Sequence, residues 1–299
     1  MALPAAGCIT IKRRTEVKKE EIRPQLDSSE EELLARYNAQ VRAVQSLQAT
    51  VDLIPSTGTT YSGVIEEYHD VPGFILAARP ATVRVIGQAP VVAKNIFDMV
   101  SDGNEFRIYI PSKNTFLVGP TALIRPSKKP LENLRPQHVV EALFWPEFSP
   151  NSNVLFEQFD FSVSRYYILT LLREADSGKF EIARKVWYSR TDLQVSRVQL
   201  FGPGGKLDAD IAYTDWQPAT ASFSSDAAPA KQPVSFARDI HIWRPQDDYK
   251  LEIKILKLTL NEPISPDKFE LAQPEGTDLV RVSDDPSGAQ SGSQPVSRQ

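Results

Sequence analysis

Apolar and polar residues alternate along the stretch 74–119, and this is the clearest pattern in the chain. Asp102-Gly103 lies at its centre, a dipeptide that adopts the positive φ angles of a two-residue type I′ turn at little cost. A hairpin folded there places residue 99 opposite residue 106 and residue 97 opposite residue 108. One face is then apolar and carries Phe97, Met99, Phe106 and Ile108, while Asp98 faces Arg107 on the other. A slip of one residue would move the apolar side chains into water, so the pattern predicts a hairpin with a well-specified register.

The same period of two predicts strands along most of the remaining chain. They are expected at 47–54, 59–68, 74–87, 93–102, 104–111, 114–119, 154–160, 164–174, 179–189, 193–201, 205–217, 234–243 and 248–260. In the last of these, apolar residues occupy odd positions as far as Ile255 and even positions from Leu256, which indicates a β-bulge. The stretch 219–232 is rich in Ala, Ser and Pro and is predicted to be an irregular insertion.

Two segments show a helical period instead. Ser28 with Glu31 three residues later is typical of a capping box at a helix start. A second, shorter helix is predicted from Pro136 to Trp145, because proline suits the first position of a helix and Pro146 would end it. Apolar residues recur at helical spacing along one side of each segment: Leu34, Tyr37, Val41 and Val44 in the first, and Val139, Val140, Leu143 and Phe144 in the second.

Composition narrows the classes of function. The chain has 299 residues, of which 41% are apolar, and one large β domain is the better prior for such a sequence. A formal net charge of −4 gives no reason to expect nucleic acid as a partner. A single cysteine excludes an internal disulfide and a cysteine-based metal cluster, and the three histidines lie far apart in the sequence. We find no nucleophile-elbow motif, so we expect no catalytic residues, cofactor or metal, although a hydrolase that uses only carboxylates stays open.

The start of the chain resembles the end of a bacterial lipoprotein signal peptide. Residues 1–8 end in Ala5-Ala6-Gly7 before the lone Cys8, which we expect to be lipidated. The apolar run of a full signal is missing, so we expect the true leader to begin further upstream; an incidental cysteine is the alternative. Residues 9–26 are predicted to be a flexible tether and residues 284–299 a disordered tail.

Short motifs in and around the hairpin resemble one protein family. They are Ala78-Arg79-Pro80, Val83-Arg84-Val85, Ala89-Pro90, Val100-Ser101-Asp102-Gly103 and Tyr109-Ile110-Pro111. The pattern is similar to that of the Lol-type bacterial outer-membrane lipoprotein carriers and acceptors, LolA and LolB, and of related envelope lipoproteins of undefined role. The resemblance extends from Leu33 to Val280.

This resemblance implies a mainly β (α+β) domain over residues 27–283. Its single, strongly curved antiparallel sheet would form a half-barrel of about 11–12 strands, with an N-terminal helix and a short second helix over the concave face. The residues expected to line a cavity for acyl chains are Phe97, Met99, Phe106, Ile108, Leu169, Leu171 and Val186. The residues expected on the lid helices are Leu34, Tyr37, Val41, Val44, Val140 and Phe144.

The resemblance also suggests a role and a location. The protein would be a monomer that binds the acyl chains of lipids or lipoproteins, anchored by lipid to the outer membrane and facing the periplasm of a Gram-negative bacterium. Ile9 follows Cys8 where the family's inner-membrane retention signal has an aspartate. The alternative is a structural or assembly lipoprotein with a closed core, which acts by contact with an envelope protein partner.

Overall fold

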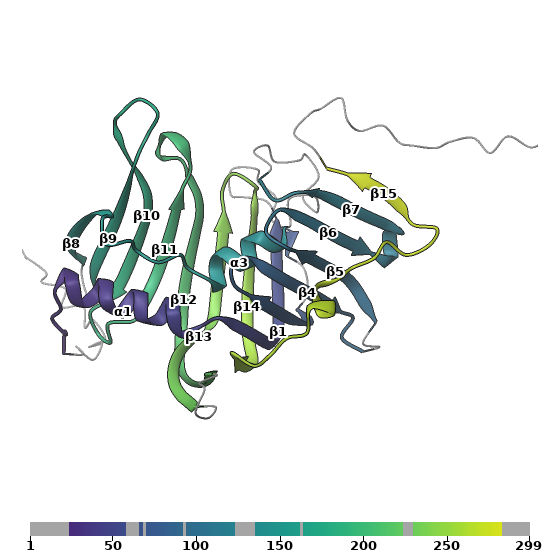
Figure 1. Ribbon diagram of the computed structural model, residues 1–299, viewed down its shortest axis with the longest axis horizontal. Coiled ribbons are helices and arrows are strands. Elements are labelled where there is room, and N and C mark those ends of the chain that lie inside the picture. The colour runs from purple at the N-terminus through teal and green to yellow at the C-terminus, as the bar shows by residue number, and fades with distance from the viewer. Residues whose placement is uncertain are drawn as a thin grey trace, which may run out of the picture.

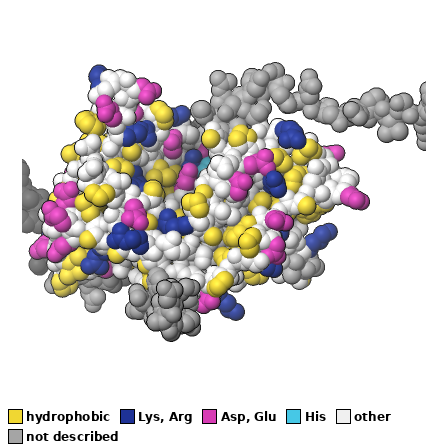
Figure 2. Space-filling view, viewed as in Figure 1, with side chains coloured by type: hydrophobic (Ala, Val, Ile, Leu, Met, Phe, Trp, Pro, Cys, Tyr) yellow, Lys and Arg dark blue, Asp and Glu magenta, His cyan; other side chains and the backbone are white. Residues whose placement is uncertain are grey.

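The fold is one open β-sheet with two α-helices on one of its faces (Figure 1). Seen from the same side, hydrophobic side chains are interspersed with charged side chains of both signs (Figure 2). The computed structural model describes residues 24–57, 66–67, 70–91, 94–122, 135–161, 164–223 and 230–282. Fifteen strands belong to the sheet, and the order of fourteen is β15-β7-β6-β5-β4-β3-β1-β14-β13-β12-β11-β10-β9-β8, with β2 paired to β1. The predicted mainly β architecture with two covering helices is confirmed. No helix in the described part of the chain is long and apolar enough to span a bilayer.

Most strands lie where the sequence pattern predicts them, but β15 was not predicted, and most of the predicted strand 59–68 lies outside the described residues. The strands are β1 Ser46–Thr57, β2 Glu66–Glu67, β3 Val71–Ala78, β4 Thr82–Gln88, β5 Asn95–Ser101, β6 Glu105–Ile110, β7 Thr115–Pro120, β8 Asn153–Phe161, β9 Ser164–Glu174, β10 Phe180–Ser189, β11 Val195–Phe201, β12 Leu207–Phe223, β13 Ala230–Arg244, β14 Tyr249–Leu260 and β15 Asp278–Arg281. The predicted bulge is confirmed: Thr50 pairs with Lys257 and Val51 with Ile255, so Leu256 has no partner in this ladder.

Three expectations about the strands are wrong. The predicted strand 74–87 is two strands, because the chain turns at Arg79-Pro80. The predicted insertion 219–232 is instead mostly strand, since β12 and β13 pair as far as Phe223 and Ala230; ladder pairing overrides the weak strand propensity of Ala, Ser and Pro there. The sheet is also mixed, because β15 runs parallel to β7.

The central hairpin turns one residue later than predicted. Asp102 Oδ1 accepts hydrogen bonds from the amides of Asn104 (2.8 Å) and Glu105 (2.9 Å), so the loop is Gly103-Asn104. Met99 therefore lies opposite Ile108 rather than Phe106. A shift of two residues leaves every side chain on its predicted face, and the apolar face is buried as expected.

The predicted charge pair of this hairpin is also wrong. Asp98 pairs with Arg84 of β4, with Nη2–Oδ2 and Nε–Oδ1 distances of 2.7 and 3.0 Å. Arg107 contacts Glu105 on its own strand instead. The shifted register places Arg107 opposite Val100, which removes the expected cross-strand partner.

Helix α1 (Glu30–Ala43) begins one residue later than predicted. Ser29, not Ser28, is the N-cap: its hydroxyl accepts from the amide of Glu32, whose carboxylate accepts from the amide of Ser29. This phase turns Leu33 inward and leaves Leu34 partly buried at the edge of the apolar stripe. Figure 1 shows α1 crossing in front of β9–β12.

The end of α1 is fixed by Asn261, directly after β14. Its left-handed backbone (φ 58°) lets Oδ1 accept from the amides of Gln45 (2.8 Å) and Ser46 (3.2 Å). Its Nδ2 donates to the carbonyl of Ala43 at 2.9 Å. The chain that leaves α1 is thereby joined to the last long strand of the sheet.

Candidate functional site

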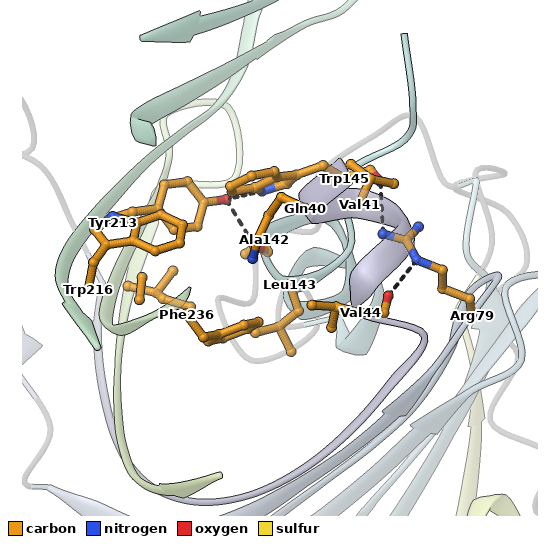
Figure 3. Close-up of a pocket in the computed structure, with 12 residues that line it drawn as sticks. Gln40, Val41, Val44, Arg79, Ala142, Leu143, Trp145, Tyr213, Trp216 and Phe236 are labelled. Atoms are coloured by element: carbon orange, nitrogen blue, oxygen red, sulfur yellow. Dashed lines mark hydrogen bonds between the residues drawn. The ribbon is translucent and has the colours of Figure 1, made fainter. Parts of the chain in front are cut away.

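The candidate site is the hollow between the helices and the inner face of the sheet, defined as the face that carries α1 and α3 (Pro136–Leu143). A small cavity of about 20 Å³ lies at the end of both helices (Figure 3). Three groups of residues line it: Gln40, Val41 and Val44 from α1 and its cap; Ala142, Leu143 and Trp145 from the end of α3; and Arg79, Tyr213, Trp216, Phe236, Ala237 and Ile240 from the sheet and its turns.

A larger cavity of about 120 Å³ lies beside it under the middle of α1. Its wall is more polar and consists of Arg36, Tyr37, Gln40, Trp145, Tyr188, Leu193, Gln194, Val195, Trp216 and Ser235. Gln40, Trp145 and Trp216 line both cavities. We call these three residues the partition, since each of them lines both spaces.

Aromatic contacts hold the partition in place. Trp145 stacks on Tyr37 with the ring centroids 5.3 Å apart and meets Tyr213 edge-on at 5.2 Å. Its indole Nε1 donates to the Tyr213 hydroxyl at 2.8 Å, and that hydroxyl donates to the carbonyl of Ala142 at 2.9 Å (Figure 3). Burial raises the pKa of both tyrosines, so both hydroxyls stay neutral. The Tyr37 hydroxyl is buried without a hydrogen-bond partner among the described residues.

Two arginines, the partly buried Arg79 and the buried Arg184, hold the chain around the end of α3. Arg79 donates from Nε to the carbonyl of Val44 (2.9 Å) and from Nη2 to the carbonyl of Trp145 (3.0 Å), as Figure 3 shows. Arg184 donates to the carbonyl of Pro146 at 2.9 Å. One guanidinium, that of Arg79, therefore ties the end of α1 and the end of α3 to the same turn of the sheet.

Further polar contacts fasten α1 along its length. Asn38 exchanges two hydrogen bonds with the backbone of Phe148. Gln40 donates to the carbonyl of Ser235 at 2.8 Å, and the Tyr188 hydroxyl donates to the carbonyl of Leu33 at 3.2 Å. Individual hydrogen bonds therefore hold α1 on the sheet in addition to the packing of its apolar stripe.

A buried polar cluster lies where α3 meets the turn between β13 and β14. His138 Nδ1 contacts the Tyr249 hydroxyl, and its Nε2 lies 4.0 Å from Asp247. Arg244 bridges Asp247 (2.6 Å) and Glu141 (2.8 Å). Burial lowers the pKa of His138 and raises that of Glu141. The cluster anchors α3, because two of its members belong to the helix and three to the sheet.

The predicted cavity residues occupy the inner face but lie away from these two cavities. Met99, Phe106, Ile108, Leu169 and Val186 are buried there, and Phe97 and Leu171 are partly buried. None of the seven is among the residues that line either described cavity. Their role in binding a ligand stays a prediction.

The predicted lid residues lie closer to the hollow. Val41 and Val44 line the small cavity and Tyr37 the larger one. Val140 and Phe144 are buried, and Arg79 lies 5.0 Å above the Phe144 ring. Leu34 is partly buried against the core. Cys8 falls outside the described residues.

Sequence reasoning missed the partition and the arginines. Trp145 and Trp216 carry no motif, and nothing in a strand pattern indicates which aromatic residue will meet a helix. Arg79 did stand in the quoted Ala-Arg-Pro motif. An arginine beside a proline, directly after the apolar residues 74–78, was the one available signal for a partly buried charged group at this turn.

Several solved structures are similar in fold to this chain. A LolA superfamily protein from Nitrosomonas europaea is 9% identical, with 82% of this chain and 99% of that chain covered and a TM-score of 0.47. A DUF1329 family protein from Desulfovibrio piger is 12% identical, with 80% and 94% covered and a TM-score of 0.49. A domain from Vibrio parahaemolyticus, named for outer membrane lipoprotein sorting, is 10% identical, with 79% and 95% covered and a TM-score of 0.47.

LolA-type proteins are thus among the structures that resemble this chain, as the sequence predicted. No protein-family model and no curated protein matches the sequence. Identities this low bear on the fold alone, so the function has to be argued from the geometry of this chain.

Proposed function

We propose that the protein binds an acyl chain, of a lipid or of an acylated lipoprotein, in the hollow beneath α1 and α3. The observation that carries this proposal is the partition, three side chains that line two neighbouring spaces beneath the covering helices. Burial of apolar chain surface would supply the affinity, at about 25 cal/mol per Å². No bond is made or broken in this role, which is one of carrier or acceptor.

The hollow described above is its closed form. A cavity of about 150 Å³ holds one benzene molecule, and the larger cavity here has about 120 Å³. A longer chain enters only when Trp145 and Gln40 move and the cavities join. Both residues belong to the covering segments, so the movement of α1 and of the α3 end opens the site.

In this proposal, Arg79 holds the site in its closed form. Its two hydrogen bonds hold the covering segments at the same time, and the rigid fork of a guanidinium suits two carbonyl acceptors. Loss of these bonds frees both segments together. The site would then open in one step rather than helix by helix.

We further propose that Cys8 is lipidated and holds the protein at the outer membrane, facing the periplasm. Two acyl chains on one residue would make such anchoring effectively permanent. The test is mass spectrometry of the chain expressed with its native upstream sequence. We expect an acyl mass increment on Cys8, absent in Cys8→Ser; an unmodified Cys8 contradicts the anchor without affecting the binding site.

The second candidate is a structural or assembly protein with a closed core. The packed aromatic side chains around Trp145 favour it, since they already fill most of the hollow. In that role the covering helices never open. The outer surface would bind an envelope protein partner.

One experiment separates the two candidates. The purified full chain is extracted for lipid, analysed by mass spectrometry, and titrated with a fluorescent fatty-acid probe. We expect stoichiometric probe uptake that fatty acid displaces, with faster uptake in Arg79→Leu and unchanged uptake in Arg107→Leu, which removes an exposed arginine. Absence of co-purified lipid and of probe uptake in all three proteins would establish the closed core.

A further inference from the structure

The outer face of the sheet, opposite the helices, brings together three side chains that the proposed lipid site does not use. Asp239 and His241 lie two residues apart on β13 and so point to the same side of the sheet. Glu252 of β14 is the direct cross-strand partner of His241. Ile240 and Ile242, which alternate with them, are buried in the core, and this places the three polar side chains outside.

The distances among these groups fit a single metal ion. His241 Nε2 lies 3.4 Å from Asp239 Oδ1, and Nδ1 lies 3.7 Å from Glu252 Oε2. One ligand atom from each of the three residues can be chosen so that all lie within 4.8 Å of one another. Zinc bonds of about 2.1 Å in a tetrahedron separate two ligand atoms by roughly 3.4 Å. His241 Nε2 and Asp239 Oδ1 already have that spacing. Glu252 Oε2 lies beside the other ring nitrogen, so the Glu252 side chain has to rotate to bring an oxygen to an ion bound at Nε2.

The hydrogen bonding leaves ligand atoms available. Asp239 Oδ1 is buried yet accepts no hydrogen bond from any described residue. Glu252 uses Oε1 for Lys254 at 2.8 Å, so Oε2 remains directed toward the ring. The side chain of His241 is 46% exposed, which gives an ion and its remaining water ligands access from solvent.

The net charge of the three side chains and the types of their ligand atoms indicate which ion would bind. Two carboxylates and one ammonium leave a net negative charge for a cation. An imidazole nitrogen disfavours Mg²⁺ and Ca²⁺, which take oxygen ligands, and suits Zn²⁺ and its neighbours in the first transition row. We propose that Asp239, His241 and Glu252 form a Zn²⁺ site on the outer face of the sheet, with water at the open position.

A metal site could not be predicted from the sequence, because the three histidines are far apart in it. The fold supplies what the sequence spacing lacked, since the β13–β14 register sets a carboxylate opposite His241. Among the described residues this is the one grouping of three such side chains close enough to share an ion.

The test is calorimetric titration of the full chain with zinc chloride, in a Cys8→Ser background because a thiol itself binds zinc. We expect one ion per chain, with affinity weakened roughly tenfold or more in His241→Ala and in Glu252→Gln. Lys254→Met should tighten binding, because it removes the neighbouring positive charge and frees the second oxygen of Glu252.

Asp52→Asn is the matched control. Asp52 is the cross-strand partner of Lys254 on the same face, but it is not one of the three ligands. The variant therefore removes an equal charge without removing a ligand, and its affinity should change little. Co²⁺ in place of Zn²⁺ should give a visible absorption band that His241→Ala abolishes. Equal affinities in all variants, or no binding, would overturn the site.

Discussion

Asn38 and Phe148 exchange two hydrogen bonds: Asn38 Nδ2 donates to the Phe148 carbonyl, and the Phe148 amide donates to Asn38 Oδ1, both at 2.9 Å. The pair joins the middle of α1 to the chain that follows α3. It fastens the two covering segments to each other, whereas Arg79 fastens both to the sheet.

Replacement of Asn38 by leucine should loosen this junction. The backbone amide and carbonyl of Phe148 would lose their partners at a partly buried position, which costs about 1–3 kcal/mol of unfolding free energy. Urea unfolding measures the loss, and the fatty-acid probe should enter faster. Arg42→Ala is the control, because its ion pair with Glu147 joins the same segments but is exposed at both ends; that variant should be close to wild type.

Two substitutions of Arg79 distinguish the effect of its hydrogen-bond geometry from the effect of its positive charge. Arg79→Leu removes both hydrogen bonds and should lower the unfolding free energy by roughly 1.5–3 kcal/mol. Arg79→Lys keeps the positive charge but has no planar fork to reach both carbonyls, so we expect it to behave like the leucine variant. Full recovery of stability in the lysine variant would show that the charge alone holds the segments.

Removal of the Trp145 ring should join the two cavities. Trp145→Ala deletes a buried ring of the partition and should cost about 3–5 kcal/mol of unfolding free energy. We expect the variant to bind a short-chain probe that the wild type excludes. Trp243→Ala serves as the comparison, since that ring is 38% exposed on the outer face. Tighter probe binding in the second variant alone would contradict the position of the site.

His138 makes the stability of the protein depend on pH. Burial, together with the positive charges of Arg244 and Arg135, holds the pKa of His138 well below the ordinary 6.5. The unfolded chain therefore takes up a proton below pH 6.5 while the folded chain does not, so stability falls as the pH falls from that value toward the folded pKa.

Unfolding free energies at pH 7.5 and 5.0 measure this effect. His138→Gln should reduce the loss between those two values, because the group that takes up the proton is gone. A pH dependence identical to that of the wild type would show that groups other than His138 account for it; Glu141 is not one of them, because burial raises its pKa and its protonation in the folded chain opposes a loss of stability at low pH.

Much of this architecture could be predicted from the alternation of apolar and polar side chains along the sequence. Most strands, the two helices, the bulge at Leu256 and the buried face of the central hairpin could be predicted, because each depends on neighbours within a few residues; β15 and the extension of β12 and β13 into residues 219–232 could not. The turn at Gly103-Asn104 was misplaced, since two amides bonded to the Asp102 carboxylate outweigh the preference of an Asp-Gly pair.

The candidate site was harder to predict from the sequence, because it depends on contacts between segments that are distant in the chain. The link between Asn261 and the end of α1 spans more than two hundred positions. The partition unites Gln40, Trp145 and Trp216 from three elements. No local pattern in the sequence predicts that these three side chains lie together.

The partition has a practical consequence. Of the four tryptophans in the chain, Trp145 and Trp216 are part of the wall between the cavities. A guest that fills the joined space would displace these indoles from their present surroundings and alter their emission. Tryptophan emission would therefore report the proposed binding of an acyl chain without an added dye.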